Sequence, residues 1–448
     1  MTDLRATLDE RRALGKAARD RAPRSSHGRW IEAERGHDAL QTIEAQNSIR
    51  VPELLPLRRG RMAVSPWNYF RGAAAVMAAD LATQPNSGLE VQLCGDAHVL
   101  NYGLWATPER NLQFDLRDFD ETLPGPFEWD VKRLAASLVV AARDSGVSAT
   151  RADEAVAAAV GAYRTRMARY ATIPELDLWY DGIHVDSLIG YFEPADRGRV
   201  SIHIEKKAKR RTSRGAFAKL TTMVDGRPRI TEDPPIRVTI SDEEQDGLVG
   251  PFLDEYLTTL QEDRQRLFDR YALVDVVRQV VGVGSVGMRV YLVLVEGRSG
   301  DDPLFLQVKQ AGSSVYEPHL GASRHDNHGA RVIAGKRLLQ SATDIFVGWG
   351  SMQGRDYYVR QFRDMKVIPT TDLIAPHLAE FATACGETLA RAHARSGDAA
   401  AIGAYLGKGG RFAAAMGEFA RAYADQNERD HAQLVAALAK GSLAGVPG

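Results

Sequence analysis

The sequence predicts an α+β protein with two lobes, a small one built on an antiparallel sheet and a large one that is mostly helical. Three apolar strand patterns, "LVDVVRQVVG", "MRVYLVLVEG" and "PLFLQVKQA", follow one another with glycine-rich or Gly-Asp-Asp turns between them, which predicts an antiparallel meander. Long amphipathic helix patterns stand before and after this meander. With 448 residues, 44% of them hydrophobic, the chain is long enough for one large two-lobed domain or two to three ordinary ones.

The remaining elements follow from local patterns. The charged N-terminal segment predicts a helical arm over the main body. "LEVQLCG" and "NLQFDL" are short strands, and "WDVKRLAASLVVAARDSG" and "SATRADEAVAAAVGAYRTRMARYA" are amphipathic helices. "VDGRPRI" predicts a hairpin turn, "GARVIAGKRLLQSATD" a helix and "RDYYVRQF" a strand. The chain after Asp372 is predicted to be helical with short breaks.

The composition excludes several classes of protein. The formal net charge is −1, so no overall field attracts nucleic acid or an anionic membrane. Two cysteines, Cys94 and Cys385, are too few for a disulfide framework or a Cys-x-x-Cys zinc site, which favours a reducing compartment. The chain has no secretory signal at its start and no apolar run long enough to span a bilayer. We therefore expect a cytoplasmic protein without membrane or nucleic-acid partners; its oligomeric state stays open.

A basic segment, "EKKAKRRTSRG", lies between residues 205 and 215. It has no interleaved aromatic side chains, so it does not predict a nucleic-acid site. It is interpreted as a solvated face or a patch that contacts phosphate on a substrate.

A glycine-rich turn, "VGVGSVG", contains Gly282, Gly284 and Gly287, with Ser285 between them. A Rossmann dinucleotide site requires such a turn to open a helix, whereas here it leads into a strand. In that setting the bare backbone lies over phosphate groups as a lid. An ordinary flexible hairpin is the alternative interpretation.

Lys309 lies inside the apolar strand "LFLQVKQA". A buried ammonium group needs a partner, unless the side chain reaches the surface at a sheet edge. A glycine turn followed by a hairpin and a strand lysine resembles the nucleotide-binding part of a protein kinase. That resemblance implies a glutamate partner, for which Glu317 is the nearest downstream candidate, although Pro318 follows it.

The stretch "VQLCGDAHVLNYG" places Asp96 and Asn101 five residues apart, with His98 between them. Kinase catalytic loops use a carboxylate to accept the proton of the substrate hydroxyl, and an asparagine to bind Mg²⁺. A second acid completes the metal site; in "FDLRDFDE" it is Asp118, with Asp115 as second choice. These residues predict ATP and Mg²⁺ as cofactors. His98 is interpreted as a hydrogen-bonding neighbour.

The order of these motifs is reversed relative to a kinase, because the acids precede the glycine turn. The segment "FATACGETLARAHARSGD" resembles the helix before the catalytic loop in aminoglycoside kinases. Placing residues 50–195 after that helix restores the usual order, so we predict a circularly permuted kinase-like fold. In that branch an aspartate opening the next helix, here Asp130, ties down the catalytic loop. Asp120 and Glu121 are interpreted as turn acids or helix N-terminal charges.

The predicted organisation has four parts. They are an N-terminal helical arm (1–50), the catalytic part of the large lobe (51–195), the small nucleotide-binding lobe (196–370) and C-terminal helices that complete the large lobe (371–448).

Four long strings also resemble a bacterial family catalogued as domain of unknown function 2252: "GRMAVSPWNYFRGAA", "CGDAHVLNYG", "FDETLPGPFEWDVKRLAAS" and "ARAHARSGD". The resemblance runs from about Arg50 to Gly410. The family usually has asparagine before the Asp-Phe-Asp-Glu string, where this chain has Arg117. This resemblance implies no activity.

We therefore expect an ATP- and Mg²⁺-dependent phosphotransferase, with Asp96 as base. Its acceptor is predicted to be a small hydroxylated metabolite or an antibiotic rather than a protein. A nucleotide-binding pseudokinase, an AMP-transferase and a two-metal phosphoesterase built on Asp96, His98, Asp115, Asp118 and Asp120 stay as alternatives. Arg61 and Arg71 either reach the active cleft or serve packing.

Overall fold

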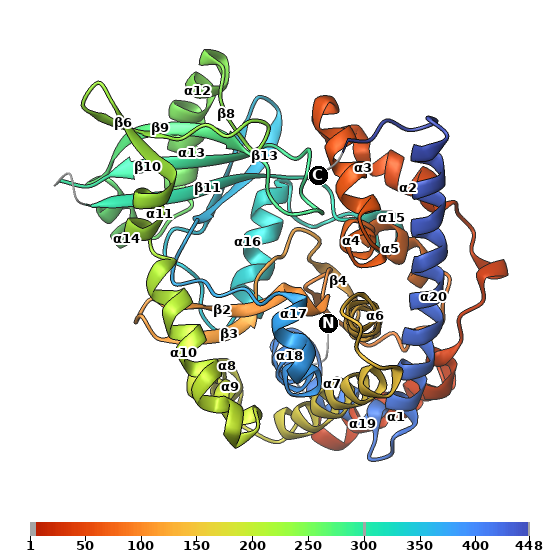
Figure 1. Cartoon of the computed structure of the whole chain (residues 1–448). Coiled ribbons are helices and arrows are strands. Elements are labelled where there is room, and N and C mark those ends of the chain that lie inside the picture. The colour runs from red at the N-terminus through yellow and green to blue at the C-terminus, as the bar shows by residue number, and fades with distance from the viewer. Residues whose placement is uncertain (1–5, 299–301, 447–448) are drawn as a thin grey trace.

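The computed structural model describes residues 6–298 and 302–446. The first five residues of the predicted arm, the last two of the C-terminal segment, and Gly300 and Asp301 of the Gly-Asp-Asp turn lie outside these ranges. The architecture is α+β: a six-stranded antiparallel sheet stands beside a larger, mainly helical part (Figure 1). Within the described residues, no helix combines the length and apolar character needed to cross a bilayer.

The main sheet confirms the predicted meander. Its strand order is β12-β13-β11-β10-β9-β8, and every neighbouring pair is antiparallel. The strands are β8 (Arg237–Thr239), β9 (Ala272–Gln279), β10 (Val290–Glu296), β11 (Pro303–Ala311), β12 (Gly348–Met352) and β13 (Arg355–Gln361). β11 is central and buried along its whole length, as its apolar sequence predicts.

Side chains along β11 point alternately to opposite faces of the sheet, and the two faces have different surroundings. Leu306 and Val308 pack into an apolar cluster with helices on one face of the sheet. Gln307 and Lys309 point to the other face, where they line a cavity. The helices and hairpin around the sheet are α11 (Ser213–Leu220), β6 (Thr221–Val224), β7 (Arg227–Ile230), α12 (Asp242–Val249), α13 (Pro251–Thr258), α14 (Glu262–Phe268), α15 (Glu317–Leu320) and α16 (His328–Leu339).

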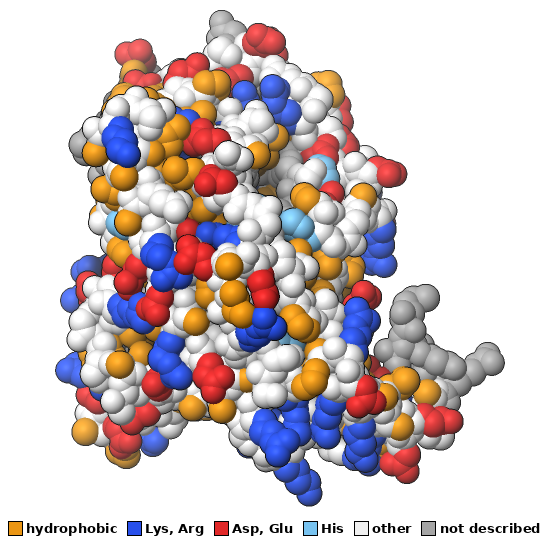
Figure 2. All heavy atoms as spheres, turned by 90° about the vertical axis from the view of Figure 1, so that its right-hand side faces the viewer, with side chains coloured by type: hydrophobic (Ala, Val, Ile, Leu, Met, Phe, Trp, Pro, Cys, Tyr) orange, Lys and Arg blue, Asp and Glu red, His pale blue; other side chains and the backbone are white. Residues whose placement is uncertain are grey.

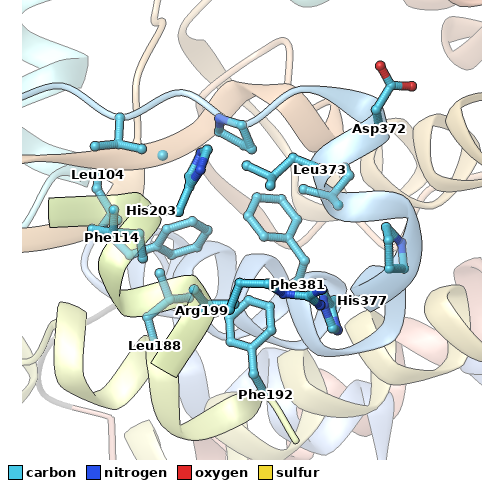
Figure 3. Close-up of a pocket in the computed structure, with 17 residues that line it drawn as sticks. Leu104, Phe114, Leu188, Phe192, Arg199, His203, Asp372, Leu373, His377 and Phe381 are labelled. Carbon is cyan, nitrogen blue, oxygen red and sulfur yellow. The ribbon is translucent and has the colours of Figure 1, made fainter. Parts of the chain in front are cut away.

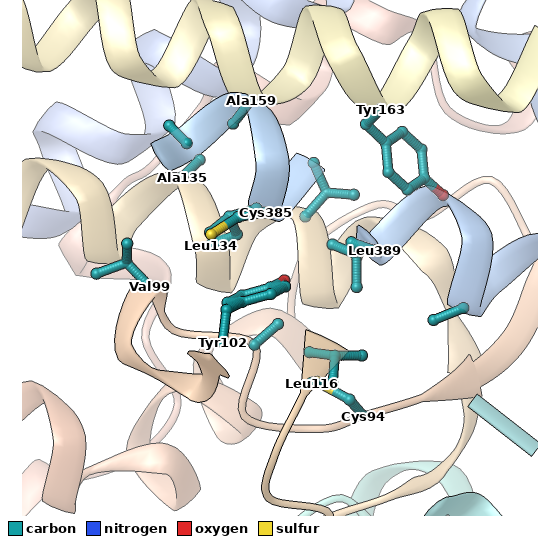
Figure 4. Close-up of a cluster of buried hydrophobic side chains, with 14 of the residues drawn as sticks. Cys94, Val99, Tyr102, Leu116, Leu134, Ala135, Ala159, Tyr163, Cys385 and Leu389 are labelled. Carbon is teal, nitrogen blue, oxygen red and sulfur yellow. The ribbon is translucent and has the colours of Figure 1, made fainter. Parts of the chain in front are cut away.

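The helical part surrounds a second, larger core. Figure 4 shows its centre, where Tyr102, Leu134, Cys385 and Leu389 pack together from strands and helices. Both cysteines of the chain are free and buried. The helices are α6 (Phe127–Asp144), α7 (Ala149–Tyr170), α8 (Glu175–Tyr180), α9 (Val185–Tyr191), α10 (Pro194–Arg210), α17 (Thr371–Ile374), α18 (Leu378–Ala394), α19 (Ala399–Leu406) and α20 (Arg411–Ala439). α10 buries Ile204 and Ala208 in this core, although the predicted range 196–370 assigned most of it to the small lobe.

Small sheets and N-terminal helices complete this part. The strands are β1 (Glu90–Leu93), β2 (Tyr102–Ala106), β3 (Leu112–Leu116), β4 (Leu123–Pro126) and β5 (Ile183–His184). The N-terminal helices are α1 (Leu8–Arg21), α2 (Ala39–Gln46), α3 (Leu55–Ala63), α4 (Pro66–Gly72) and α5 (Ala74–Ala82). α1 lies against α19, where Arg11 binds Asp398 at 2.8 Å. On the face that carries α20, acidic and basic side chains are interspersed (Figure 2).

The end of α18 lies beside β1, although some 300 residues of chain separate them. The backbone N–H of Gln92 donates to Ser396 Oγ at 3.0 Å. A Cβ at Gly397 would lie 2.8 Å from the Glu90 carbonyl oxygen, so only glycine fits this approach. α18 therefore ends at the strand that leads to Asp96.

Asp130, in the first turn of α6, holds the segment after β1. Its carboxylate accepts from the backbone N–H groups of Cys94 at 2.7 Å and Gly95 at 3.1 Å. His393 of α18 approaches the same carboxylate at 3.2 Å, and both side chains are fully buried. These contacts agree with the tie predicted for Asp130.

We expect Asp130→Ala to lower the free energy of unfolding by about 3–5 kcal/mol, because two buried N–H groups lose their acceptor. Denaturant unfolding measures this loss. Asp153→Ala on α7 is the control, since its pair with Arg421 is exposed and its loss costs less than about 1 kcal/mol. Equal losses in the two variants would contradict the bracing role of Asp130.

Candidate functional site

A cavity of about 840 Å³ lies between the sheet and the helical part. Seven of the residues predicted from sequence line it: Asp96, Asn101, Asp118, Gly282, Gly284, Ser285 and Lys309. They come from segments more than two hundred residues apart, so only the folded chain brings them together. Glu317, Asp115 and Gly287, which were also predicted, do not line it.

Lys309 is the contact between the two sides of this cavity. Its side chain is 1% exposed, and its ammonium group forms an ion pair with Asp120 and lies 3.8 Å from Asp118. Tyr358 donates its hydroxyl to the other oxygen of Asp120 at 2.8 Å. Burial by itself would lower the pKa of Lys309, but the two carboxylates outweigh it and raise that pKa, so the side chain is charged.

The expectation that Glu317 pairs with Lys309 is wrong. Glu317 accepts from the Ser314 N–H at 3.0 Å and lies 3.8 Å from Arg331. Helix α16, which comes after the short α15 that holds Glu317, carries no acid. Its Arg331 donates to the carbonyl oxygens of Asp120 and Thr122 at 2.7 Å each. The absence of acids from this helix is a sequence signal that the partner of Lys309 comes from elsewhere.

Asp115 belongs to the core and not to the cavity, which corrects its assignment as a second-choice metal ligand. Its carboxylate is fully buried and forms an ion pair with Arg391 of α18. It also accepts from the backbone N–H of Ser341 at 2.8 Å and from the Ser341 hydroxyl at 2.7 Å. Asp115 lies within β3, whereas Asp118 lies beyond its end, so the two side chains reach different surroundings.

Asp118 and Asn101 fit a hard divalent cation. Oδ1 of Asp118 is buried and has no hydrogen-bond partner among the described residues. Asn101 donates to the carbonyl oxygens of Asp96 at 2.8 Å and Asp118 at 3.0 Å, and its own oxygen accepts from the Asp118 N–H at 2.8 Å. One lone pair stays on that oxygen for a metal.

The Asn101 side chain therefore braces the two acid-bearing loops in addition to any ligand role. Among the residues that the structure describes, no group of three or more His, Cys, Asp and Glu could hold a metal ion. A cation at Asp118 therefore needs amide or phosphate oxygens to complete its shell.

The charges around Asp118 favour its ionised form. Burial alone would raise the pKa of Asp118, but Lys309, Arg360 and Arg117 outweigh it and lower that pKa. The same burial, together with the negative charge of Asp118, raises the pKa of Asp120. Of the two acids beside Lys309, Asp118 is the stronger candidate for a metal ligand.

Asp96 lies at the opposite end of the Asn101 brace. Arg133 of α6 donates to its Oδ1 at 2.8 Å, and His98 Nε2 lies 3.8 Å from Oδ2. Burial raises the pKa of Asp96, and the Arg133 guanidinium opposes this shift without cancelling it. Burial also lowers the pKa of His98 well below its usual value, so this imidazole is neutral. A carboxylate with a raised pKa is suited to accept a proton.

The glycine turn joins β9 to β10, and its first part covers the cavity through Gly282, Gly284 and Ser285. Gly287 has a different task. Its φ is +89°, which favours glycine, and a Cβ there would lie 2.9 Å from Arg50 Cβ. The Val51 N–H donates to the Gly287 carbonyl at 2.8 Å, which fastens the end of the turn to the N-terminal part.

Sequence reasoning missed most of the basic residues of the cavity. The lining side chains outside the predicted set include Arg117, Arg360, Arg363 and Lys366. Arg211 of the predicted basic segment and Arg71, expected to reach the cleft or to serve packing, also line it. The run "VRQFRDMK", at the end of β13 and just after it, carries three of them, and this local density of positive charge was the available signal.

Figure 3 shows a second cavity, of about 340 Å³. Apolar side chains such as Phe114, Leu188, Phe192 and Phe381 line it, with His203 pointing into it. Pro369 lines both cavities, so the chain that leads from β13 to α18 separates them. The residues predicted from sequence to carry chemistry line the larger cavity, which is therefore the candidate site.

The fold and site thus describe an α+β protein with a charged cavity between a sheet and a helical part. The chain belongs to the family described as "Uncharacterized protein conserved in bacteria (DUF2252)", which matches residues 50–437. No curated protein and no solved structure matches it significantly.

Glu121 predicts a measurable pH dependence. Burial raises its pKa to about 7, although the Val315 N–H donates to it at 2.7 Å. The folded protein holds this proton more tightly than the unfolded chain, so stability is lost as pH rises from about 4.5 through 7. Between pH 5 and 8, we expect the free energy of unfolding of Glu121→Gln to rise by about 2 kcal/mol relative to that of wild type. Denaturant unfolding at each pH measures this difference. If wild type instead became more stable relative to Glu121→Gln over this range, the raised pKa of Glu121 would be contradicted.

Proposed function

We propose that this protein is an ATP- and Mg²⁺-dependent phosphotransferase with a circularly permuted kinase-like architecture. The observation that supports it most is the position of Lys309 between Asp118 and Asp120, at a cavity that the glycine turn also lines. A strand lysine, a glycine-rich turn and a metal-binding acid are the three parts that kinases bring together around nucleotide phosphates.

The chain connectivity supports the permutation. α18 ends beside β1, so a chain running from α18 directly into β1 would carry the order of a kinase large lobe. The segment between β13 and α18 lines the cavity at Ile368 and Thr370, in the place of a link between two lobes. The acid that pairs with the lysine differs from that of kinases. Here it is Asp120, whereas kinases use a glutamate on a helix.

Each side chain has a defined task in this proposal. Lys309 exchanges part of its ion pair with Asp120 for nucleotide phosphate, and the backbone of Gly282 and Gly284 covers that phosphate. Asp118 and Asn101 would hold Mg²⁺ through their side-chain oxygens, and the ion would supply positive charge that neutralises the nucleotide phosphates. Asp96 orients the acceptor hydroxyl and takes its proton, while Arg133 fixes the carboxylate.

The phosphoesterase alternative loses one of its acids, because Asp115 is bound to Arg391 and Ser341 in the core. An AMP-transferase would use the same nucleotide site, and the product of the reaction distinguishes the two activities.

We expect ATP with Mg²⁺, at about 100-fold over its Kd, to raise the free energy of unfolding by about 2.7 kcal/mol. Asp118→Asn should remove most of the Mg²⁺-dependent part, and Lys309→Ala should remove the nucleotide effect. Thermal denaturation with and without each ligand measures both.

Asp115→Asn is the matched control, since it alters an acid three residues from Asp118 that does not face the cavity. It should lower stability and keep the nucleotide shift. No shift of wild type with any nucleotide would overturn the proposal, and a shift retained by Lys309→Ala would place the nucleotide elsewhere.

A further inference from the structure

The cavity carries more positive charge than a bound nucleotide uses. Seven basic and three acidic side chains line it, an excess of four positive charges in a chain whose net charge is −1. Because Mg²⁺ cancels part of the charge of ATP, the complex neutralises only part of this excess. A local excess of this kind in a concave site attracts anions.

Most of these cations form no ion pair with a carboxylate among the described residues. Within residues 6–298 and 302–446, none of the following forms an ion pair: Arg71, Arg117, Arg211, Arg360, Arg363 and Lys366. Arg360 donates only to the neutral Gln307, at 2.8 and 3.0 Å. Lysines and arginines that stand unpaired in a partly buried site are costly unless an anion binds there.

Arg71 and Arg117 are the two members nearest to the catalytic side. Nε of each is buried and lacks a hydrogen-bond partner among the described residues. Asp96 is close enough to Arg71 for its charge to oppose the lowering of the Arg71 pKa by burial. Both arginines also act on His98, whose pKa their charges help to lower. The geometry agrees, because Arg71 lies over the Trp67 ring, which is 5.8 Å from the His98 ring, and both arginines line the cavity together with Asp96 and His98.

The fold positions these two side chains. Arg117 crosses Gly103 of β2, where a Cβ would lie 3.0 Å from Arg117 Cδ, so a larger residue would crowd it. The Arg117 N–H donates to the Asn101 carbonyl at 3.0 Å. Arg71 follows Trp67 by one helical turn in α4, and its guanidinium lies 5.9 Å from that ring.

We infer that the acceptor carries an oxyanion, a phosphate ester or a carboxylate, beside the hydroxyl that Asp96 activates, and that Arg71 and Arg117 bind this group. The inference rests on the proposed phosphotransferase and adds the charge of its substrate. Guanidinium groups bind both kinds of oxyanion through paired N–H donors. The basic side chains that line the cavity would also repel a polycationic acceptor such as a polyamine antibiotic.

Titration calorimetry tests this with inorganic phosphate and malonate as probes. Wild type, both free and saturated with Mg²⁺ and a non-hydrolysable ATP analogue, should bind at least one probe saturably. Arg117→Asn and Arg71→Gln should each weaken that binding about tenfold or more while leaving the analogue bound. Lys309→Ala should lose the analogue and keep the probe. Arg421→Gln, an exposed change on α20, is the control and should keep both.

The outcomes separate the two proposals. Probe binding that the analogue displaces and Lys309→Ala abolishes would overturn the acceptor site and leave the nucleotide site standing. Probe binding unchanged in both Arg117→Asn and Arg71→Gln would also overturn it, as would no saturable binding. If no analogue binds wild type but the probe binds through the two arginines, the phosphotransferase fails and the oxyanion site stands. Preference for phosphate over malonate would identify a phosphate ester, and the reverse a carboxylate.

Discussion

The ammonium group of Lys309 is buried in the central strand of the sheet, and it is neutralised from the other part of the molecule. Asp120 pairs with it, Asp118 lies 3.8 Å away, and Tyr358 holds the far oxygen of Asp120. A buried charge without such partners would cost several kcal/mol, so the sheet and the helical part are held in one relative placement. Arg331 adds to this by binding the carbonyl groups of the same acidic segment.

The acidic loops are themselves fixed by side chains that accept or donate several bonds at once. Asn101 joins the loop of Asp96 to that of Asp118, and Asp130 holds the backbone just before Asp96. Asp115 fastens β3 to α18. These polar groups are deeply buried and mutually satisfied, which gives a rigid arrangement around the cavity. Rigidity of this kind suits a site that acts by positioning and by charge, as phosphoryl transfer requires.

The excess of positive charge is confined to the cavity. Across the whole chain acids and bases nearly cancel, and on the face of α20 they are interspersed (Figure 2). Inside the cavity they do not cancel, since basic residues from α4, β13 and the segment after it converge on one space. Net charge therefore says little about a concave site, where the walls keep out the water that screens charges elsewhere.

The sequence by itself determined the elements and the kinds of residue in the site. Apolar periodicity identified β9, β10, β11 and β13 and the long helices, because side-chain burial repeats at the spacing of each element. The spacing of Asp96 and Asn101 and the burial of Lys309 could also be predicted, because each depends on a short continuous stretch of sequence. The family resemblance also followed from continuous strings, and it holds over residues 50–437.

Only the tertiary structure decided which acidic side chain pairs with which basic side chain. Asp115 and Asp118 are three residues apart, yet one faces Arg391 in the core and the other the cavity. Asp120, and not Glu317, meets Lys309 across 189 residues of chain. The sequence also did not show that Arg117 and Arg360 line the cavity together with Arg71, because these arginines come from separate elements. Such pairings depend on how the lobes dock, and docking is set by the sum of many buried contacts that no local pattern encodes.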